Sequence, residues 1–192
     1  IFQKQKELIE RAERRLISLL SLIRDLLALG ALKGELPEAK KTEVILNGVV
    51  NRAVDAVQPE VEEKEIALRV DVPETLITFK ANEEDLERLL GNLLENAVKY
   101  TPPAGKVHLA LGSNEKGIHL TVSDTGIGIP PEALPRIFEE FYRAKNAKEM
   151  GKEGTGLGLS LVKHIVDRYR GKVEVESRIN EGTTFAVTLP KE

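Results

Sequence analysis

Apolar residues near the start of the chain recur at alternating spacings of three and four, the pattern of one face of a helix packed in a bundle. The stripe consists of Ile9, Ala12, Leu16, Leu19, Ile23 and Leu26, and Leu20 and Leu27 widen it. An apolar face this broad on a helix of about 30 Å needs partners, and no other segment repeats the pattern. We expect these partners to come from sequence outside this chain, from a second subunit, or from both. The alternative is an amphipathic helix that lies on its own domain.

The next part of the chain alternates between helix and strand patterns. Residues 30–41 contain two glycines and a proline and predict a linker. Thr42 is expected to cap a helix that runs to about Val57 and stops before Pro59. Apolar alternation and a proline stop then predict two strands, at 66–72 and up to residue 79, and a helix at 82–100.

The second half predicts a hairpin, a long loop, a helix and two closing strands. The hairpin strands are 107–111 and 118–122, the helix is 157–169, and the closing strands are 172–177 and 183–189. Residues 130–155 are bounded by proline and glycine and rich in Lys and Glu, which is typical of a functional lid. This order of elements predicts an α+β fold, a two-layer α/β sandwich whose mostly antiparallel sheet is covered on one face by helices.

The composition of the chain excludes several classes of partner and of catalytic group. The formal net charge is -3 with acidic and basic residues interspersed, so we expect no nucleic-acid partner. The absence of cysteine excludes thiolate metal sites and cysteine nucleophiles, and fits a reducing compartment. The longest nearly apolar stretch, residues 16–23, is well short of the ~20 residues of a membrane helix. We therefore expect this portion to be cytoplasmic and to make no membrane contact, whether or not the parent protein is anchored in a membrane.

Two asparagines lie four residues apart on the helix predicted at 82–100. Asn92 and Asn96 share a helical face that borders an apolar stripe, although asparagine is a poor helix former. An amide oxygen can bind Mg²⁺ without adding a second anion beside a triphosphate, and Lys99, one turn later, can neutralise phosphate charge. The alternative is that the amides only satisfy backbone groups.

A second cluster stands where the predicted strand 118–122 ends. Asp124 is followed by Gly126, Gly128 and Ile129. A carboxylate there can accept a proton from an exocyclic amine and so favour adenine over guanine, while the glycines let the backbone approach the base. The alternative is a tight turn that begins with aspartate.

The third cluster opens the helix predicted at 157–169. Its sequence is Gly154, Thr155, Gly156, Leu157, Gly158 and Leu159. Backbone N–H groups of a glycine-rich helix start form a cradle for phosphates, and a plain loop-to-helix junction would not need three alternating glycines. The chain has no Gly-Lys-Ser/Thr of a P-loop, no dinucleotide fingerprint, and no His-Arg-Asp or Asp-Phe-Gly.

In order and spacing, four motifs resemble the N, G1, F and G2 boxes of sensor histidine kinases. They are 92–101 (NLLENAVKYT), 124–128 (DTGIG), 138–143 (FEEFYR) and 154–159 (GTGLGL). The resemblance implies the Bergerat-type ATP-binding fold that Hsp90, MutL and gyrase B ATPases share. It also implies that residues 1–34 are the second helix of a dimerisation and phosphotransfer hairpin, 35–42 a linker, and 43–192 the ATP-binding catalytic domain.

The resemblance further implies residue roles and partners. Asn96, Lys99 and Arg143 would be the catalytic residues, with Asn96 binding Mg²⁺ and Arg143 reaching the γ-phosphate of ATP. The other nucleotide contacts would be Asn92, Tyr100, Asp124, Gly126, Gly128, Ile129, Tyr142, residues 154–159 and Thr183. The expected partners are a response regulator receiver domain and a second copy, through the N-terminal helical bundle of the full-length protein.

This chain departs from the family pattern at one point. The helix that carries the acceptor histidine is absent, and His108, His119 and His164 are expected to be ordinary strand or helix residues. The resemblance implies transfer of the γ-phosphoryl group to an external histidine. Rival interpretations are an ATP-gated conformational domain, which a water-activating Glu95 would favour, a serine kinase of the anti-sigma type, and a purely structural dimerisation module.

Overall fold

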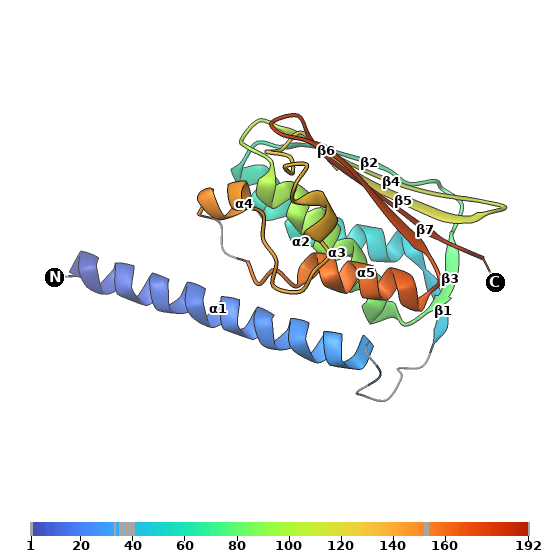
Figure 1. The fold of residues 1–192 in the computed structure, drawn as a ribbon, viewed down its shortest axis with the longest axis horizontal. Helices are drawn as coiled ribbons and strands as arrows, with labels where there is room; N and C mark the ends of the chain where they lie inside the picture. The colour runs from blue at the N-terminus through green and yellow to red at the C-terminus, as the bar shows by residue number, and fades with distance from the viewer. Residues whose placement is uncertain (1, 33, 35–40, 152–153, 192) are drawn as a thin grey trace.

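The computed structural model describes residues 2–32, 34, 41–151 and 154–191, so most of the predicted linker, residues 35–40, lies outside the described residues. Figure 1 shows a layer of helices beneath a twisted sheet, with a long N-terminal helix running below both. The helices are α1 (Phe2–Leu32), α2 (Leu46–Glu63), α3 (Glu83–Tyr100), the 3₁₀ turn η1 (Leu134–Arg136), α4 (Lys145–Glu149) and α5 (Gly158–Arg168). The strands are β1 (Thr42–Ile45), β2 (Ala67–Asp71), β3 (Thr78–Ala81), β4 (Lys106–Asn114), β5 (Gly117–Asp124), β6 (Lys172–Arg178) and β7 (Gly182–Leu189).

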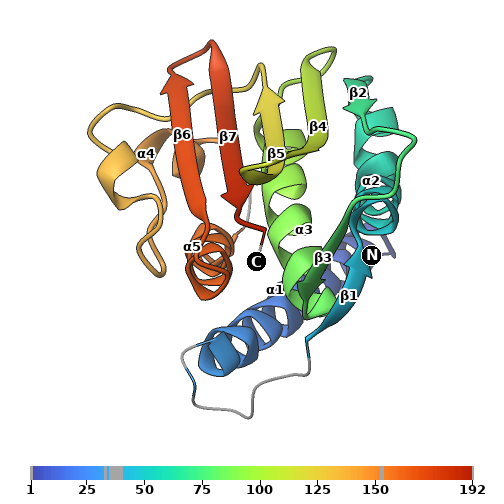
Figure 2. The same ribbon diagram turned by 90° about the vertical axis from the view of Figure 1, so that its right-hand side faces the viewer.

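Five of the strands form one sheet in the order β2-β4-β5-β7-β6. Strands β2 and β4 are parallel, and the other neighbours are antiparallel. Figure 2 shows this order, with α2, α3 and α5 all on one side of the sheet. The predicted α+β fold, a mixed and mostly antiparallel sheet covered on one face by helices, is confirmed.

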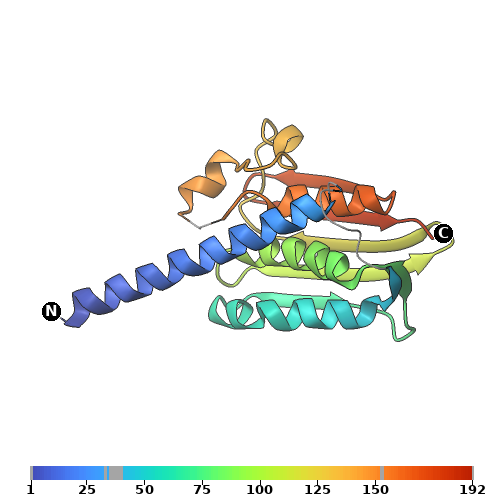
Figure 3. The same cartoon turned by 90° about the horizontal axis from the view of Figure 1, so that it is seen from below.

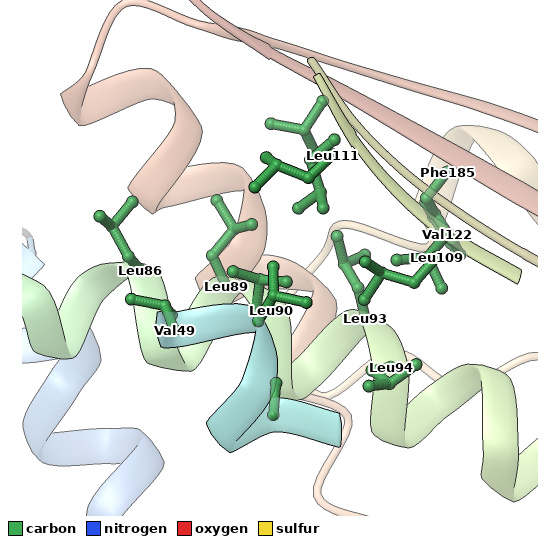
Figure 4. Close-up of a cluster of buried hydrophobic side chains, with 14 of the residues drawn as sticks. Val49, Leu86, Leu89, Leu90, Leu93, Leu94, Leu109, Leu111, Val122 and Phe185 are labelled. Atoms are coloured by element: carbon green, nitrogen blue, oxygen red, sulfur yellow. The ribbon is translucent and has the colours of Figure 1, made fainter. Parts of the chain in front are cut away.

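Alternation along the strands places the core between the sheet and the helices. Leu109, Val122 and Phe185 point from three neighbouring strands toward Leu89 and Leu93 of α3, and all five are buried (Figure 4). Helix α3 is central because it packs against α2 on one side and α5 on the other. The Asn92 and Asn96 face of α3 is therefore directed away from a fixed apolar core.

The region around Thr42 differs from the sequence prediction. Thr42 does not cap a helix: residues 42–45 form β1, which pairs antiparallel with β3. Helix α2 begins only at Leu46 and continues through Pro59, where we predicted that it would stop. Val57 and Val61, on either side of Pro59, are both buried. Their burial compensates for the backbone hydrogen bond that proline removes.

Helix α5 is joined to the start of α3 by a buried tyrosine. The Tyr169 hydroxyl donates to Asp85 (2.8 Å) and accepts from the backbone N–H of Asn82 (2.9 Å). Arg168 donates to the same carboxylate at 3.2 Å. This network fixes the two helices that carry the asparagine pair and the glycine loop.

Helix α1 touches the rest of the protein near its C-terminal end. Ala28 and Leu29 are buried against Leu157 and Leu161 at the start of α5, and Figure 3 shows the N-terminal half of α1 projecting past the other elements. Most of the predicted apolar stripe is exposed: Ile9, Leu16, Leu19, Leu20, Ile23, Leu26 and Leu27. The C-terminal end of α1 thus docks on its own domain, as the alternative held, and the expectation of further partners for the exposed residues stays a prediction.

Candidate nucleotide-binding site

A cleft of about 1360 Å³ lies between α3, the loop after β5, residues 141–147 and the start of α5, and α1 lies along one side of it. Fifteen of the predicted binding residues line it: Asn92, Asn96, Lys99, Tyr100, Asp124, Gly128, Ile129, Tyr142, Arg143, Gly154, Thr155, Gly156, Gly158, Leu159 and Thr183. They come from segments almost 100 residues apart in sequence. The fold therefore brings the three clusters into one site.

The cleft-lining face of α3 supplies the amides. Asn82 begins the helix by accepting from the Glu84 N–H, which sets the register that places positions 92, 96 and 99 toward the cleft. The Asn92 amide donates to the carbonyl of Arg88 (2.8 Å), so part of its bonding does satisfy the backbone, as the alternative interpretation held. Its oxygen faces Gly158, where a Cβ would lie 2.4 Å away. Glycine at 158 thus lets the start of α5 approach this amide closely.

Two cations flank the glycine loop at one end of the cleft. A Cβ on Gly154 would lie 2.9 Å from Lys99 Nζ and 3.9 Å from the guanidinium of Arg143. The absence of a side chain at this position leaves a gap between the two positive groups. Together with the backbone N–H groups at the start of α5, this arrangement is suited to an anion such as phosphate.

The other end of the cleft contains the carboxylate of Asp124. It accepts from the backbone N–H of Gly126 at 2.7 Å and from the backbone of Thr183. Burial raises the pKa of Asp124 to about 6, and these two hydrogen bonds only partly oppose that effect. Such a group binds a donor best when it is ionised. Thr183, the least specific of the predicted contacts, does lie beside Asp124 across the β5–β7 pair.

The loop after Asp124 is tied to the turn between β6 and β7. Asn180 N–H donates to the Ile127 carbonyl (2.9 Å), and Ile129 N–H donates to the Ser177 hydroxyl (2.8 Å). Gly128 has a φ of +65°, and a Cβ there would lie 1.9 Å from the Arg178 carbonyl oxygen. Only glycine fits this position.

Two predicted residues do not line the cleft. Gly126 supports Asp124 from behind, where a Cβ would meet the carbonyl of Tyr100 at 2.6 Å. The side chain of Leu157 is fully buried against α1. Any contact of Leu157 with a ligand would therefore have to use its backbone.

The glycine loop is also bound to α1. The Thr155 hydroxyl donates to Asp25 at 3.0 Å, and Arg88 reaches the Arg24 carbonyl at 3.5 Å. Burial raises the pKa of Asp25, while the bond from Thr155 lowers it. Helix α1 thus contacts the segment that the sequence assigned to phosphate binding.

Sequence reasoning missed several cleft residues. Among them are Phe141, Asn146 and Ala147 in the predicted lid. Residues 145–149 form α4, whereas 152 and 153 of the lid lie outside the described residues. Asn146 donates to the Gly128 carbonyl at 2.8 Å. A lone asparagine in a charged segment gives no signal of this contact.

The described residues contain no group of three or more His, Asp or Glu side chains that could hold a metal ion. A metal at this site would need an amide such as Asn96 and oxygens from the ligand itself, which is how Mg²⁺ commonly binds with nucleotides. The donor set therefore fits Mg²⁺ bound together with a nucleotide.

The three histidines do not line the cleft. His108 contacts Asp71 (2.8 Å), His119 contacts Thr188 (3.3 Å), and His164 contacts the Ser160 carbonyl (2.8 Å). Their expected role as ordinary strand and helix residues fits these positions.

No helix in the described part of the chain has the length and apolarity to cross a membrane.

A partly buried carboxylate at one end and a glycine loop with two cations at the other are features of a nucleotide-binding domain. Comparison with known proteins identifies its family. Residues 81–192 match the model of the histidine kinase-, DNA gyrase B-, and HSP90-like ATPase family, and the chain belongs to that family. Within it, the chain is similar to the ATP-binding catalytic domains of sensor histidine kinases.

Individual relatives agree with this assignment. The chain is 37% identical over 186 residues to the sensor histidine kinase RppB of Synechocystis sp., and this match covers 95% of the chain and 39% of RppB. It is 43% identical over 109 residues to the phosphate regulon sensor protein PhoR of Pseudomonas aeruginosa, covering 57% of the chain and 25% of PhoR. The chain thus spans well under half of these two proteins.

Solved structures show the same similarity. Full-length ShkA in complex with AMPPNP matches with a TM-score of 0.77 and 29% identity, over 97% of the chain and 39% of ShkA. The mycobacterial sensor histidine kinase MprB matches with a TM-score of 0.67 and 29% identity, over 78% of the chain and 97% of the solved MprB chain.

Proposed function

We propose that this domain binds Mg·ATP and transfers the γ-phosphoryl group to a histidine on a helix outside this chain, for relay to an aspartate of a response regulator. The proposal rests on the difference between the two ends of the cleft, one with a carboxylate and the other with two cations. Asp124 lies at one end, and Lys99 and Arg143 flank Gly154 at the other. A nucleotide is a molecule with a hydrogen-bonding base at one end and negative charge at the other.

In the proposed reaction, an imidazole nitrogen attacks the γ-phosphorus while the bond to the bridging oxygen of ADP breaks. Lys99 and Arg143 would neutralise charge on the phosphate oxygens, and Asn96 would hold Mg²⁺ against them. Mg²⁺, when bound, would neutralise charge on the leaving diphosphate. Asp124 would accept from the adenine amine and so orient the nucleotide along the cleft.

The proposed acceptor is external because the three histidines of this chain are held elsewhere. His108 and His119 lie in the sheet, and His164 lies on α5 with its ring bonded to the preceding turn. None can approach a γ-phosphate that moves together with its own domain.

We further propose that α1 belongs to a dimerising helical bundle. Its exposed apolar residues, Leu16, Leu20 and Leu27 among them, are too many for a helix surrounded by water. The missing partners would be the histidine helix and the same helices of a second copy. Use of ATP and the absence of cysteine favour a cytoplasmic location.

Incubation with γ-labelled ATP tests the proposal. We expect the chain alone to bind Mg·ATP and retain no acid-labile label. A separately supplied hairpin with an acceptor histidine should become labelled, at a rate limited by encounter. Label on His108, His119 or His164 would contradict the external acceptor, and release of free phosphate without label on the hairpin would favour an ATP-gated conformational domain.

A further inference from the structure

Asn146 makes two hydrogen bonds with opposite polarity at the edge of the cleft. Its Nδ2 donates to the Gly128 carbonyl (2.8 Å), and its Oδ1 accepts from the Ala147 N–H (3.0 Å). The two contacts fix the orientation of the amide, because the reverse orientation would place acceptor against acceptor and donor against donor. Asparagine alone among side chains of this size supplies both groups.

The Gly128 side of this link is rigid. The loop of residues 127–129 is tied to the β6–β7 turn by the Asn180–Ile127 and Ser177–Ile129 bonds, and Gly128 packs directly on the backbone of Arg178. The Gly128 carbonyl is therefore a fixed acceptor whose position does not depend on the lid.

The Ala147 side leads to the cation end of the cleft. The Arg143 guanidinium donates to the Ala147 carbonyl at 3.3 Å, and the same guanidinium lies near Gly154. A chain of contacts thus runs from Gly128 through Asn146 and Ala147 to Arg143. It connects the end of the cleft that contains Asp124 to the end suited to phosphate.

Within the described part of the chain, few contacts besides these join α4 to other elements. The helix has only five residues, none of them is buried, and no side chain caps its start. Its first and last residues, Lys145 and Glu149, form an ion pair of 3.8 Å at exposed positions, which contributes little and does not join the helix to another element. The position of α4 therefore depends strongly on the Asn146 link.

We propose that Asn146 is a positioning residue for phosphoryl transfer: it clips α4 to the rigid Gly128 loop and so places Arg143 against the γ-phosphate. The role of Arg143 toward that phosphate rests on the proposed function. Asn146 itself acts through Arg143 and contributes no chemistry.

Two substitutions test the clip. Asn146→Leu removes the donor and the acceptor at similar side-chain volume, and Asn146→Gln keeps an amide that reaches Gly128 from one carbon further away. Lys148→Ala, an exposed position on the same helix, is the matched control. Amide hydrogen exchange of residues 147–151 without nucleotide measures whether Asn146 holds α4 in place. Displacement of a fluorescent ATP analogue by Mg·ATP and by Mg·ADP measures the effect of each substitution on nucleotide affinity.

We expect faster exchange in α4 for Asn146→Leu, with a melting temperature close to that of the parent protein. Its affinity for Mg·ATP should fall roughly five- to tenfold, the effect of one or two hydrogen bonds, while its affinity for Mg·ADP changes less than about twofold because ADP lacks the γ-phosphate. Asn146→Gln should recover most of the loss, and Lys148→Ala should match the parent.

An unchanged rate of amide hydrogen exchange in α4 of Asn146→Leu would contradict the proposal that Asn146 holds α4 against the Gly128 loop. Equal losses for Mg·ATP and Mg·ADP would overturn the connection to Arg143, since they would place the effect at the base end or in the fold. If the parent protein bound neither nucleotide, the proposed function would fail, whereas the exchange measurement, made without nucleotide, would still decide whether Asn146 holds α4.

Discussion

The partly buried carboxylate of Asp124 makes both stability and nucleotide affinity depend on pH. Its ordinary pKa is 3.8, and burial raises it to about 6 in the folded protein. Between these values the folded state holds more protons on Asp124 than the unfolded state, so the contribution of Asp124 to stability falls as pH rises from 4 to 6 and then stays level. The difference corresponds to about 3 kcal/mol.

Replacement of Asp124 by asparagine should remove this penalty. An asparagine oxygen can still accept from the Gly126 N–H, so only the bond from Thr183 is lost, at about 1 kcal/mol. Above pH 7 we expect the free energy of unfolding of Asp124→Asn to exceed that of the parent by about 1 to 2 kcal/mol. Near pH 3, where the carboxyl is mostly protonated in both the folded and the unfolded state, this advantage should disappear.

Asp124→Asn should lower the affinity for ATP, although it raises stability. Above pH 7 the ionised carboxylate accepts from the adenine amine, whereas an asparagine can present its own NH₂ group there, so Asp124→Asn should bind ATP about 10- to 100-fold more weakly. At pH 5 only about one tenth of Asp124 is ionised, so the parent should lose about tenfold in affinity relative to pH 7.

Urea unfolding and calorimetric titration of ATP, each at several pH values on both proteins, measure these effects. Subtraction of the Asp124→Asn profile removes the titration of the nucleotide phosphates and of every other group. Parallel pH profiles for parent and variant would refute the reasoning. A variant that is less stable than the parent at pH 8 would show that Asp124 is not desolvated.

Three other substitutions probe the metal, the loop and the helix anchor. Asn96→Ala should abolish most of the Mg²⁺ dependence of ATP affinity, and a titration with the same Mg²⁺ dependence as the parent would contradict the metal assignment. Gly128→Ala should lower stability by about 2 to 4 kcal/mol in thermal melting, because its Cβ would collide with the Arg178 carbonyl. Tyr169→Phe should lower the urea midpoint by the equivalent of about 1 to 3 kcal/mol, since buried Asp85 loses a donor; an unchanged midpoint would count against the anchor.

Local signals in the sequence were sufficient to predict the α3 amide pair and the two glycine loops that line the cleft. Helix α3 begins at a capping asparagine followed by three acidic residues, and its amide pair follows from the helical spacing alone. The glycine patterns at 124–128 and 154–159 report backbone conformations that few other residues adopt. For this reason the predicted loops lie where the structure has them.

Elements whose order comes from distant partners could not be predicted. The four residues of β1 alternate too briefly to reveal a strand, and their structure depends on pairing with β3, more than 30 residues later. Helix α4 is charged and short, and its contact with Gly128 spans 18 positions. The bond between Asp25 of α1 and Thr155 of the glycine loop spans 130 residues of sequence, so no local pattern could predict it.

The bond between Thr155 and Asp25 has a thermodynamic consequence. Thr155 has one hydroxyl proton, and while it is directed at Asp25 it is not available to a ligand in the cleft. A ligand that takes this proton must weaken the docking of α1, and displacement of α1 must raise the affinity for that ligand by the same factor, because coupling free energies are reciprocal. Force or rotation applied to the N-terminal end of α1 would then change the nucleotide affinity of the cleft through Asp25 and Thr155, which are 130 residues apart in sequence.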